Sequence, residues 1–455
     1  MASVSQSFRS ASQGYPSSGY AWTVVAILSF AGVVSYVDRT IMNLLVGPIR
    51  ADLGISDTQF SLLQGIAFSF FYALLAIPLA RLSDTGNRKL VIIAGVVCWT
   101  LATFASGLAA SFAMLFAARM FIGVGEATLT PGGYSILGDY FPKEKLSAAV
   151  SVFTASSFLG SGIALILGGP LIAYLLAKGP QTLPVLGTLQ PWQMTFILVS
   201  LPSVLVLTFL IFMKEPVRQA GASEARQTME AASFADFWAF LQSKARVILS
   251  IYFGLSVLAA VLYGVTSWGA EFLMRTYGWD PAKVGLIFGP MIAVFGYSGL
   301  ASGGFVCNRL IERGMTDANL RLPIISSMCC MPFAIAFGIM PNDTLSLICL
   351  APTLFFGAMP FGIGTAALPL ISPNRMRAQM VAGYLFIANL LSYGLGPTAI
   401  AAFSDTLGGG TALGKSFSVI LPALLITGSA ILMLGLKPYR ALIAGTADLA
   451  AVPAE

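Results

Sequence analysis

The chain has 455 residues, of which 57% are hydrophobic and only 10% are charged, and it contains no histidine. Soluble domains average about a quarter charged residues, so this composition excludes an ordinary soluble protein. The formal net charge of +6 does not indicate a nucleic-acid binder, because the basic residues are concentrated in one set of loops between apolar segments.

Twelve apolar segments follow one another along the sequence. Each is long enough to cross a hydrocarbon core of about 30 Å as a helix. The predicted spans are residues 21–46, 58–80, 90–110, 112–138, 147–176, 193–213, 247–273, 283–306, 321–340, 344–367, 378–402 and 416–436. They predict an all-α membrane protein with twelve transmembrane helices.

The loops between these spans divide the basic residues unevenly. With the N-terminus inside, eighteen Lys and Arg residues fall on the inner side and five on the outer side. Basic residues concentrate in cytoplasmic loops. We therefore expect both termini in the cytoplasm and the protein in the plasma (inner) membrane. Residues 1–20 are polar and Ser-rich, which indicates a flexible tail and not a cleaved signal.

A long polar stretch, residues 214–246, separates six predicted spans from six. Within it, Phe234, Phe237, Trp238 and Leu241 recur at helical spacing, which predicts an interfacial amphipathic helix. The expected organisation is a cytoplasmic tail (1–20), a six-helix bundle (21–213), a cytoplasmic linker (214–246), a second six-helix bundle (247–436) and a second cytoplasmic tail (437–455).

The sequence offers no pattern for metal binding or catalysis. Its five cysteines lie in or at the ends of apolar spans without metal-ligand spacing, and we interpret them as packing thiols: Cys98, Cys307, Cys329, Cys330 and Cys349. We expect no metal and no cofactor. The sequence shows no nucleophile–base pair and no nucleotide-binding loop, which argues against an enzyme or a primary pump.

Two related loops indicate that the halves are a diverged repeat. Residues 80–89 (Ala-Arg-Leu-Ser-Asp-Thr-Gly-Asn-Arg-Lys) follow the second span, and Gly304-Phe-Val-Cys-Asn308-Arg309 follows the eighth, about 224 residues later. Parallel halves of this kind have their binding site between them, near the middle of the membrane.

The loop at 80–89 resembles the signature that follows the second span in the major facilitator superfamily. Asp84, Gly86, Arg88 and Lys89 match that signature, whereas Ala80 and Thr85 depart from it. Arg119 with Gly123-x-Gly125 on the fourth span resembles a second signature. The resemblance implies two pseudo-symmetric six-helix bundles and transport by alternating access.

Within that superfamily the sequence most resembles the spinster-type branch. The matching motifs are Tyr36-x-Asp38-Arg39-x-x-Met-Asn on the first span and Gly-Val-Gly-Glu126-Ala on the fourth. The branch is associated with lysophospholipid or sphingoid-lipid transport, in some members with protons. Sugar-acid and organic-anion transporters share Tyr-x-Asp-Arg, so they stay as the alternative. A second alternative is a non-transporting membrane sensor. The lack of an appended signalling domain argues against it.

Four ionisable side chains lie inside the apolar spans: Asp38, Arg39, Arg119 and Glu126. A charge in hydrocarbon costs from about 2.5 to more than 10 kcal/mol, so such residues usually mark an ion or substrate pathway. Helical geometry predicts that Asp38, Arg39 and Arg119 share one level, about 13 Å below the outer surface. It places Glu126 alone, about 10 Å deeper.

These four residues suggest a proton-coupled anion site. Because the chain lacks histidine, any proton coupling must fall to carboxylates, chiefly Glu126 and Asp38. Arg39 and Arg119 provide planar forks suited to phosphate or carboxylate. Competition between Glu126 and a substrate anion for an arginine would couple protonation to binding. The alternative is a static ion-pair cluster that ties helices together.

The second half lacks a counterpart to this charged layer. Together with Tyr36 of the first half, its candidate substrate-binding residues are Tyr263, Thr266, Tyr297, Asn389 and Tyr393. Packing or interhelical hydrogen bonding is the alternative for each. A charged head group would suit the first half and an apolar tail the second. We therefore expect an amphipathic anionic or zwitterionic substrate, protons and membrane lipids as partners, no nucleic acid, and a monomer.

Two further sets of charges lie near the ends of the spans. The resemblance implies that Asp84, Arg88 and Lys89 form a cytoplasmic gate, with Asn308 and Arg309 as a weaker counterpart in the second half; solvated surface charge is the alternative. Glu271 and Arg275, spaced i, i+4 at the outer end of the seventh span, are interpreted as an interfacial pair.

Overall fold

The computed structural model describes residues 15–216, 234–361 and 363–450. A few side chains inside these ranges, including those of Asp84 and Phe234, lie outside the description. The described part is almost entirely helical, and a short antiparallel hairpin is its one sheet.

The elements fall into two sets that flank the undescribed residues 217–233. The first set is α2 (Ser18–Thr40), η1 (Ile41–Leu44), α3 (Val46–Leu53), α4 (Asp57–Gln64), α5 (Ile66–Thr85), α6 (Arg88–Ser106), α7 (Phe112–Glu126), α8 (Leu129–Tyr140), α9 (Lys143–Lys178), β1 (Gln181–Leu183), β2 (Gly187–Leu189) and α10 (Pro191–Phe212). The second set is α12 (Phe234–Ser243), α13 (Ala245–Tyr277), α14 (Pro281–Met291), η2 (Ile292–Gly296), α15 (Tyr297–Glu312), α16 (Ala318–Phe337), α17 (Asp343–Ala358), α18 (Ile363–Ile371), η3 (Asn374–Met376), α19 (Arg377–Thr406), η4 (Gly410–Ala412) and α20 (Leu413–Ala450).

Several predicted spans form as two helices in line. The second span is α4 followed by α5, and a capping box of Ser56 and Gln59 opens it. The tenth predicted span is divided between α17 and the nine-residue α18, with Pro360 at the break. Proline cannot donate to the helical hydrogen-bond ladder. Eleven described segments are consequently long and apolar enough to span a membrane, and α17 is a shorter apolar helix.

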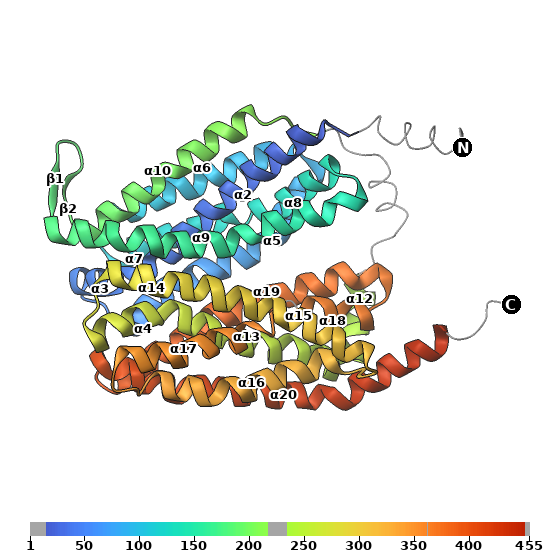
Figure 1. The fold of residues 1–455 in the computed structure, drawn as a ribbon. Helices are drawn as coiled ribbons and strands as arrows, with labels where there is room; N and C mark the ends of the chain where they lie inside the picture. Colours follow the sequence, from blue (N-terminus) through green and yellow to red (C-terminus); the bar gives the residue numbers. More distant parts are fainter. Residues whose placement is uncertain (1–14, 217–233, 362, 451–455) are drawn as a thin grey trace.

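The helices form two bundles, shown one above the other in Figure 1. The upper bundle is built from the first set, α2 to α10, and the lower from α13 to α20, with the short α4 reaching down against α19 of the lower bundle. The β1–β2 hairpin lies at the left end, which we call the hairpin end. The start of α2, the helix α12 and the end of α20 lie at the opposite end, which we call the terminal end.

The apolar core joins the two bundles at the hairpin end. One buried cluster contains Ile41, Leu44 and Phe60 of the first bundle together with Trp268 and Phe272 of the second. A separate cluster in the first bundle is built around Val96 and Trp99 and contains no described residue of the second bundle. The bundles are therefore packed together more closely toward the hairpin end.

Candidate functional site

Arg39 and Glu126 form a buried ion pair within the first bundle. Arg39 Nε donates to Glu126 Oε2 at 2.5 Å, and the Ser35 hydroxyl donates to the same oxygen at 2.7 Å. The other oxygen, Oε1, is buried and accepts no hydrogen bond from the described residues. The expectation that Glu126 stands alone was wrong. The levels were estimated from backbone positions, and the long arginine side chain crosses the predicted separation.

Aromatic rings surround the Arg39 guanidinium. Its central carbon lies 4.7 Å from the ring centre of Tyr36, 4.3 Å from that of Phe68 and 4.9 Å from that of Tyr72. Rings at this distance attract a cation through their quadrupoles. The two terminal amino groups of Arg39 donate no hydrogen bond to the described residues. The side chain is thus held in place while its fork stays available to an anion.

Asp38 and Arg119 lie close together without forming an ion pair. Asp38 Oδ2 accepts from the Thr103 hydroxyl at 3.0 Å, and Oδ1 is buried without a partner among the described residues. Among the described residues, Arg119 makes only long hydrogen bonds, to the carbonyl oxygens of Leu63 at 3.4 Å and Asp38 at 3.5 Å. Both side chains are almost fully buried. Each keeps unused hydrogen-bonding capacity.

Tyr263 and Tyr393 bring the second bundle to the same region. Their ring centres are 3.9 Å apart, and the Tyr393 ring lies 6.3 Å from Phe68 of the first bundle. A cavity of about 160 Å³ lies beside Tyr263 in the second bundle. Its wall is mainly apolar, with a few polar side chains that include Tyr384 and Asn389. The structure thus brings three predicted residues of the second half to or near one cavity.

Two other predicted residues, Thr266 and Tyr297, do not line this cavity. The Thr266 hydroxyl donates to the carbonyl of Leu262 in its own helix, and the Thr266 carbonyl accepts from Asn43 of the first bundle at 3.1 Å. Tyr297 is 55% exposed on α15. Substrate contact by these two residues stays a prediction.

Arg88, predicted as part of a surface gate, lies buried within the first bundle. It donates to the carboxylate of Asp139 on α8 and, at 2.8 Å, to Glu215 after α10. The neighbouring Lys89 donates to the carbonyl of Ile211 at 2.7 Å. These contacts tie α6 to α8 and α10, so solvated surface charge is the wrong description of Arg88.

Two further gate candidates, Asn308 and Arg309, form no hydrogen bond or ion pair with the described residues of the first bundle. Asn308 is exposed on α15, and Arg309 pairs with Glu312 at 3.5 Å with both side chains mostly exposed. The side chain of Asp84 lies outside the described residues. Every ion pair described at the terminal end joins residues of the same half.

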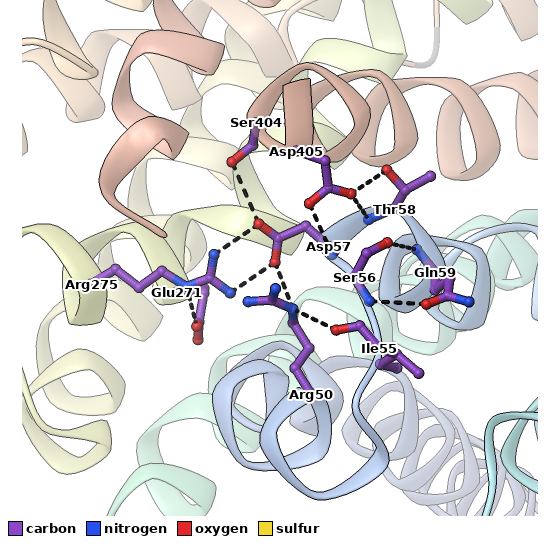
Figure 2. A network of polar contacts seen from close by, with 10 residues as sticks. All are labelled: Arg50, Ile55, Ser56, Asp57, Thr58, Gln59, Glu271, Arg275, Ser404 and Asp405. Atoms are coloured by element: carbon purple, nitrogen blue, oxygen red, sulfur yellow. Dashed lines mark hydrogen bonds and ion pairs between the residues drawn. The ribbon is translucent and has the colours of Figure 1, made fainter. Parts of the chain in front are cut away.

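A polar network that the sequence patterns did not predict joins the bundles at the hairpin end (Figure 2). At its centre is Asp57, the fully buried first residue of α4. Both terminal amino groups of Arg275 donate to the Asp57 carboxylate, each at 2.9 Å, and Arg50 Nε lies 3.0 Å from Asp57 Oδ1. Glu271 accepts from Arg275 Nε at 2.6 Å and is 3% exposed. The predicted pair of Glu271 and Arg275 exists. Its interpretation as a pair at the membrane–water interface was wrong, because it is buried between the bundles.

Asp405 of α19 completes the network by capping a helix of the other bundle. Its carboxylate accepts from the amides of Asp57 at 3.2 Å and Thr58 at 2.8 Å, and from the Thr58 hydroxyl at 2.6 Å. The first amides of a helix lack intrahelical acceptors and carry partial positive charge. The only local signal was the capping box at Ser56, because the second-bundle partners of Asp57, Arg275 and Asp405, are 218 and 348 positions away.

The known proteins that this chain is similar to are membrane transporters. The model of the Major Facilitator Superfamily matches residues 28–401. An MFS-type efflux pump of Mycolicibacterium smegmatis is 27% identical, over 92% of this chain and 94% of the relative. A probable L-galactonate transporter of Escherichia coli is 24% identical (82% and 80% covered), and a sphingosine-1-phosphate transporter of Danio rerio 25% (84% and 75%). A bacterial homolog of the human lysosomal transporter spinster, crystallised inward-facing and unoccupied, matches with a TM-score of 0.77 and 25% identity, over 94% of this chain and 98% of that one.

Proposed function

This chain belongs to the Major Facilitator Superfamily, and from that premise we propose that it moves an amphipathic anionic or zwitterionic lipid by alternating access. The observation that carries the proposal is the unequal chemistry of the two bundles. An arginine–glutamate pair among aromatic rings lies on one side. A mainly apolar cavity lies on the other.

The head group is assigned to Arg39. A phosphate or carboxylate can accept from the two terminal amino groups in the fork geometry that makes arginine–anion pairs strong. The three surrounding rings hold the guanidinium where the anion would meet it. Glu126 accepts from Nε of the same guanidinium and therefore competes with the substrate anion for the positive charge of Arg39.

The apolar tail is assigned to the second bundle. Tyr263 and Tyr393 form the border between the charged site and the cavity beside them. The cavity of about 160 Å³ is smaller than the roughly 300–1,000 Å³ of typical ligand sites. It therefore takes part of a hydrocarbon tail. The small number of polar groups in its wall disfavours a sugar acid, which needs a partner for each hydroxyl.

Proton coupling is assigned to Glu126, with Asp38 as a second carboxylate. Protonation of Glu126 removes the negative partner of Arg39 and frees the guanidinium for the substrate anion. Loss of the proton restores the pair and favours release. Asp38 has no cation within ion-pair distance among the described residues, so its charge can change without breaking such a pair.

The orientation follows from the basic loops. If the side rich in Lys and Arg is cytoplasmic, the terminal end faces the cytoplasm and the hairpin end faces outside. The shared core and the Asp57 network close the hairpin end. We therefore assign this conformation to the state that is closed to the outside.

A transport assay in proteoliposomes tests the substrate. Uptake of a lysophospholipid is compared with that of a hexuronate, with and without a pH gradient. We expect lysophospholipid transport that the gradient accelerates, and no hexuronate uptake. Hexuronate uptake without lysophospholipid transport would overturn the lipid assignment and favour the sugar-acid alternative, which the L-galactonate relative supports.

The variant Glu126→Gln tests the coupling separately. We expect it to bind substrate while its transport loses pH dependence, because a neutral amide cannot exchange protons. Glu312→Gln is the matched control, since Glu312 is exposed and its ion-pair partner is the exposed Arg309 and no residue of the site. If Glu126→Gln transports with unchanged rate and pH dependence, the coupling scheme is wrong.

A further inference from the structure

The network at the hairpin end contains two kinds of ion pair. Arg50 and Asp57 both belong to the first bundle, and Glu271 and Arg275 both belong to the second. The remaining contacts cross between bundles: Arg275 to Asp57, Ser404 to Asp57, and Asp405 to the start of α4. We propose that this network is a releasable latch, in which Arg50 and Glu271 keep their partners neutralised when the bundles part.

The physical reason lies in the cost of buried charge. Asp57 is fully buried, and a buried charge that loses its partner is strongly destabilising. A network made only of cross-bundle pairs would leave every charge alone on opening. Here Asp57 retains Arg50 at 3.0 Å, and Arg275 retains Glu271 at 2.6 Å. Separation thus breaks the bidentate cross-bundle contact and leaves each of these charges paired.

The first amides of α4 also keep hydrogen-bond partners when the bundles part. When Asp405 leaves, Ser56 and Gln59 still form the capping box of α4 within the first bundle. Asp405 itself is partly exposed in the closed arrangement, so water can replace the amides that it loses. No partner from the second bundle is required to keep the first bundle intact after opening.

This arrangement predicts opposite effects for two residues that contact each other. Asp57→Asn weakens the cross-bundle contact, so it favours the open hairpin end. Arg50→Gln leaves Asp57 paired with Arg275 while the latch is closed, but leaves it alone after opening. It therefore favours the closed hairpin end. An ionic contact that simply holds the bundles together predicts that Asp57→Asn favours opening and that Arg50→Gln, which removes no cross-bundle contact, has no effect.

Distances between spin labels at the hairpin end measure the two states. The labels are placed at Ala51→Cys on α3 and Thr411→Cys on η4, both exposed, in a protein whose five native cysteines are replaced. We expect Asp57→Asn and Asp405→Asn each to raise the open fraction about tenfold, a typical size for conformational coupling. Adding Arg50→Gln or Glu271→Gln to Asp405→Asn is expected to return the distances toward the closed state.

The proposal fails if neither Arg50→Gln nor Glu271→Gln lowers the open fraction in the Asp405→Asn protein, or if either one raises it. It also fails if Asp57→Asn and Asp405→Asn both leave the distances unchanged while remaining folded and monodisperse. The measurement uses no substrate. Its outcome is therefore separate from the question of whether the protein carries a lipid or a sugar acid.

Discussion

The central pair and the hairpin-end network are both buried contacts between arginine and carboxylate, but they use their hydrogen-bonding capacity differently. Arg39 uses only Nε, and one oxygen of Glu126 has no partner among the described residues. Arg275 uses Nε and both terminal amino groups, and both oxygens of Asp57 accept. The same chemistry thus gives an exchangeable contact in one place and a saturated contact in the other.

The two regions also differ in which parts of the molecule they join. The central pair lies within one bundle, so its charges can be exchanged with a ligand while the bundles stay together. The hairpin-end network lies between bundles, so it responds to their separation. This difference is the basis for assigning binding to the first region and gating to the second.

The largest expected effect comes from removing the exchangeable cation. Arg39→Gln leaves Glu126 buried without its partner and removes the fork that receives the anion. A hydrogen bond to a charged group contributes about 1.5–3 kcal/mol, so losing both bonds of the fork should lower substrate affinity by about 100-fold or more. Calorimetric titration of the purified protein with substrate measures this affinity. Arg275→Gln is the matched variant and should retain affinity far better; an equal loss would contradict the distinction between the regions.

A tenfold effect is expected from the backbone contact that accompanies the latch. A methyl group added at Gly169 of α9 would overlap the carbonyl of Pro281 on α14, whereas one added at Gly162 meets Ala293 at 3.7 Å. Gly169→Ala should hold the bundles apart at the hairpin end and reduce the transport rate about tenfold. Gly162→Ala, on the same helix, should transport normally. Equal rates in the proteoliposome assay would show that this end does not need to close so tightly.

A smaller and more selective effect is expected at Asp38. Asp38→Asn keeps the shape and the contact with Thr103 but cannot exchange a proton. We expect substrate counterflow to continue, while accumulation driven by a pH gradient falls several-fold. Thr103→Val, which removes the hydroxyl but retains the carboxylate, is the control for packing. Full gradient-driven accumulation by Asp38→Asn would assign coupling to Glu126 alone.

The smallest effect is expected at an exposed pair of the same residue types. Arg309 and Glu312 lie 3.5 Å apart with side chains 61% and 65% exposed. Water screens such pairs, so Arg309→Gln should change transport by less than about twofold. A larger change would revive the predicted gate role of Arg309, in a conformation in which it reaches the first bundle.

Much of the fold was predictable from local patterns. Eleven of the twelve predicted spans correspond to long apolar segments of the described chain, and the Ser-x-x-Gln pattern at Ser56 forms a capping box, as such a pattern indicates. The central site was also accessible, because Arg39 and Glu126 are charges inside apolar spans and arginine is long enough to bridge two helices. The divided tenth span shows the limit of this approach, since hydropathy does not register the break at Pro360.

The sequence by itself determined that the chain crosses the membrane many times and that charge is buried in its first half, because hydrophobicity and span length are local properties. Only the tertiary structure decided which charges meet. Arg88 pairs with Asp139 inside its own bundle. Asp57 contacts Arg275 and Asp405, which are 218 and 348 residues away along the chain. The first pair depends on how helices pack within a bundle and the others on how the two bundles dock, and no spacing along the chain encodes either arrangement.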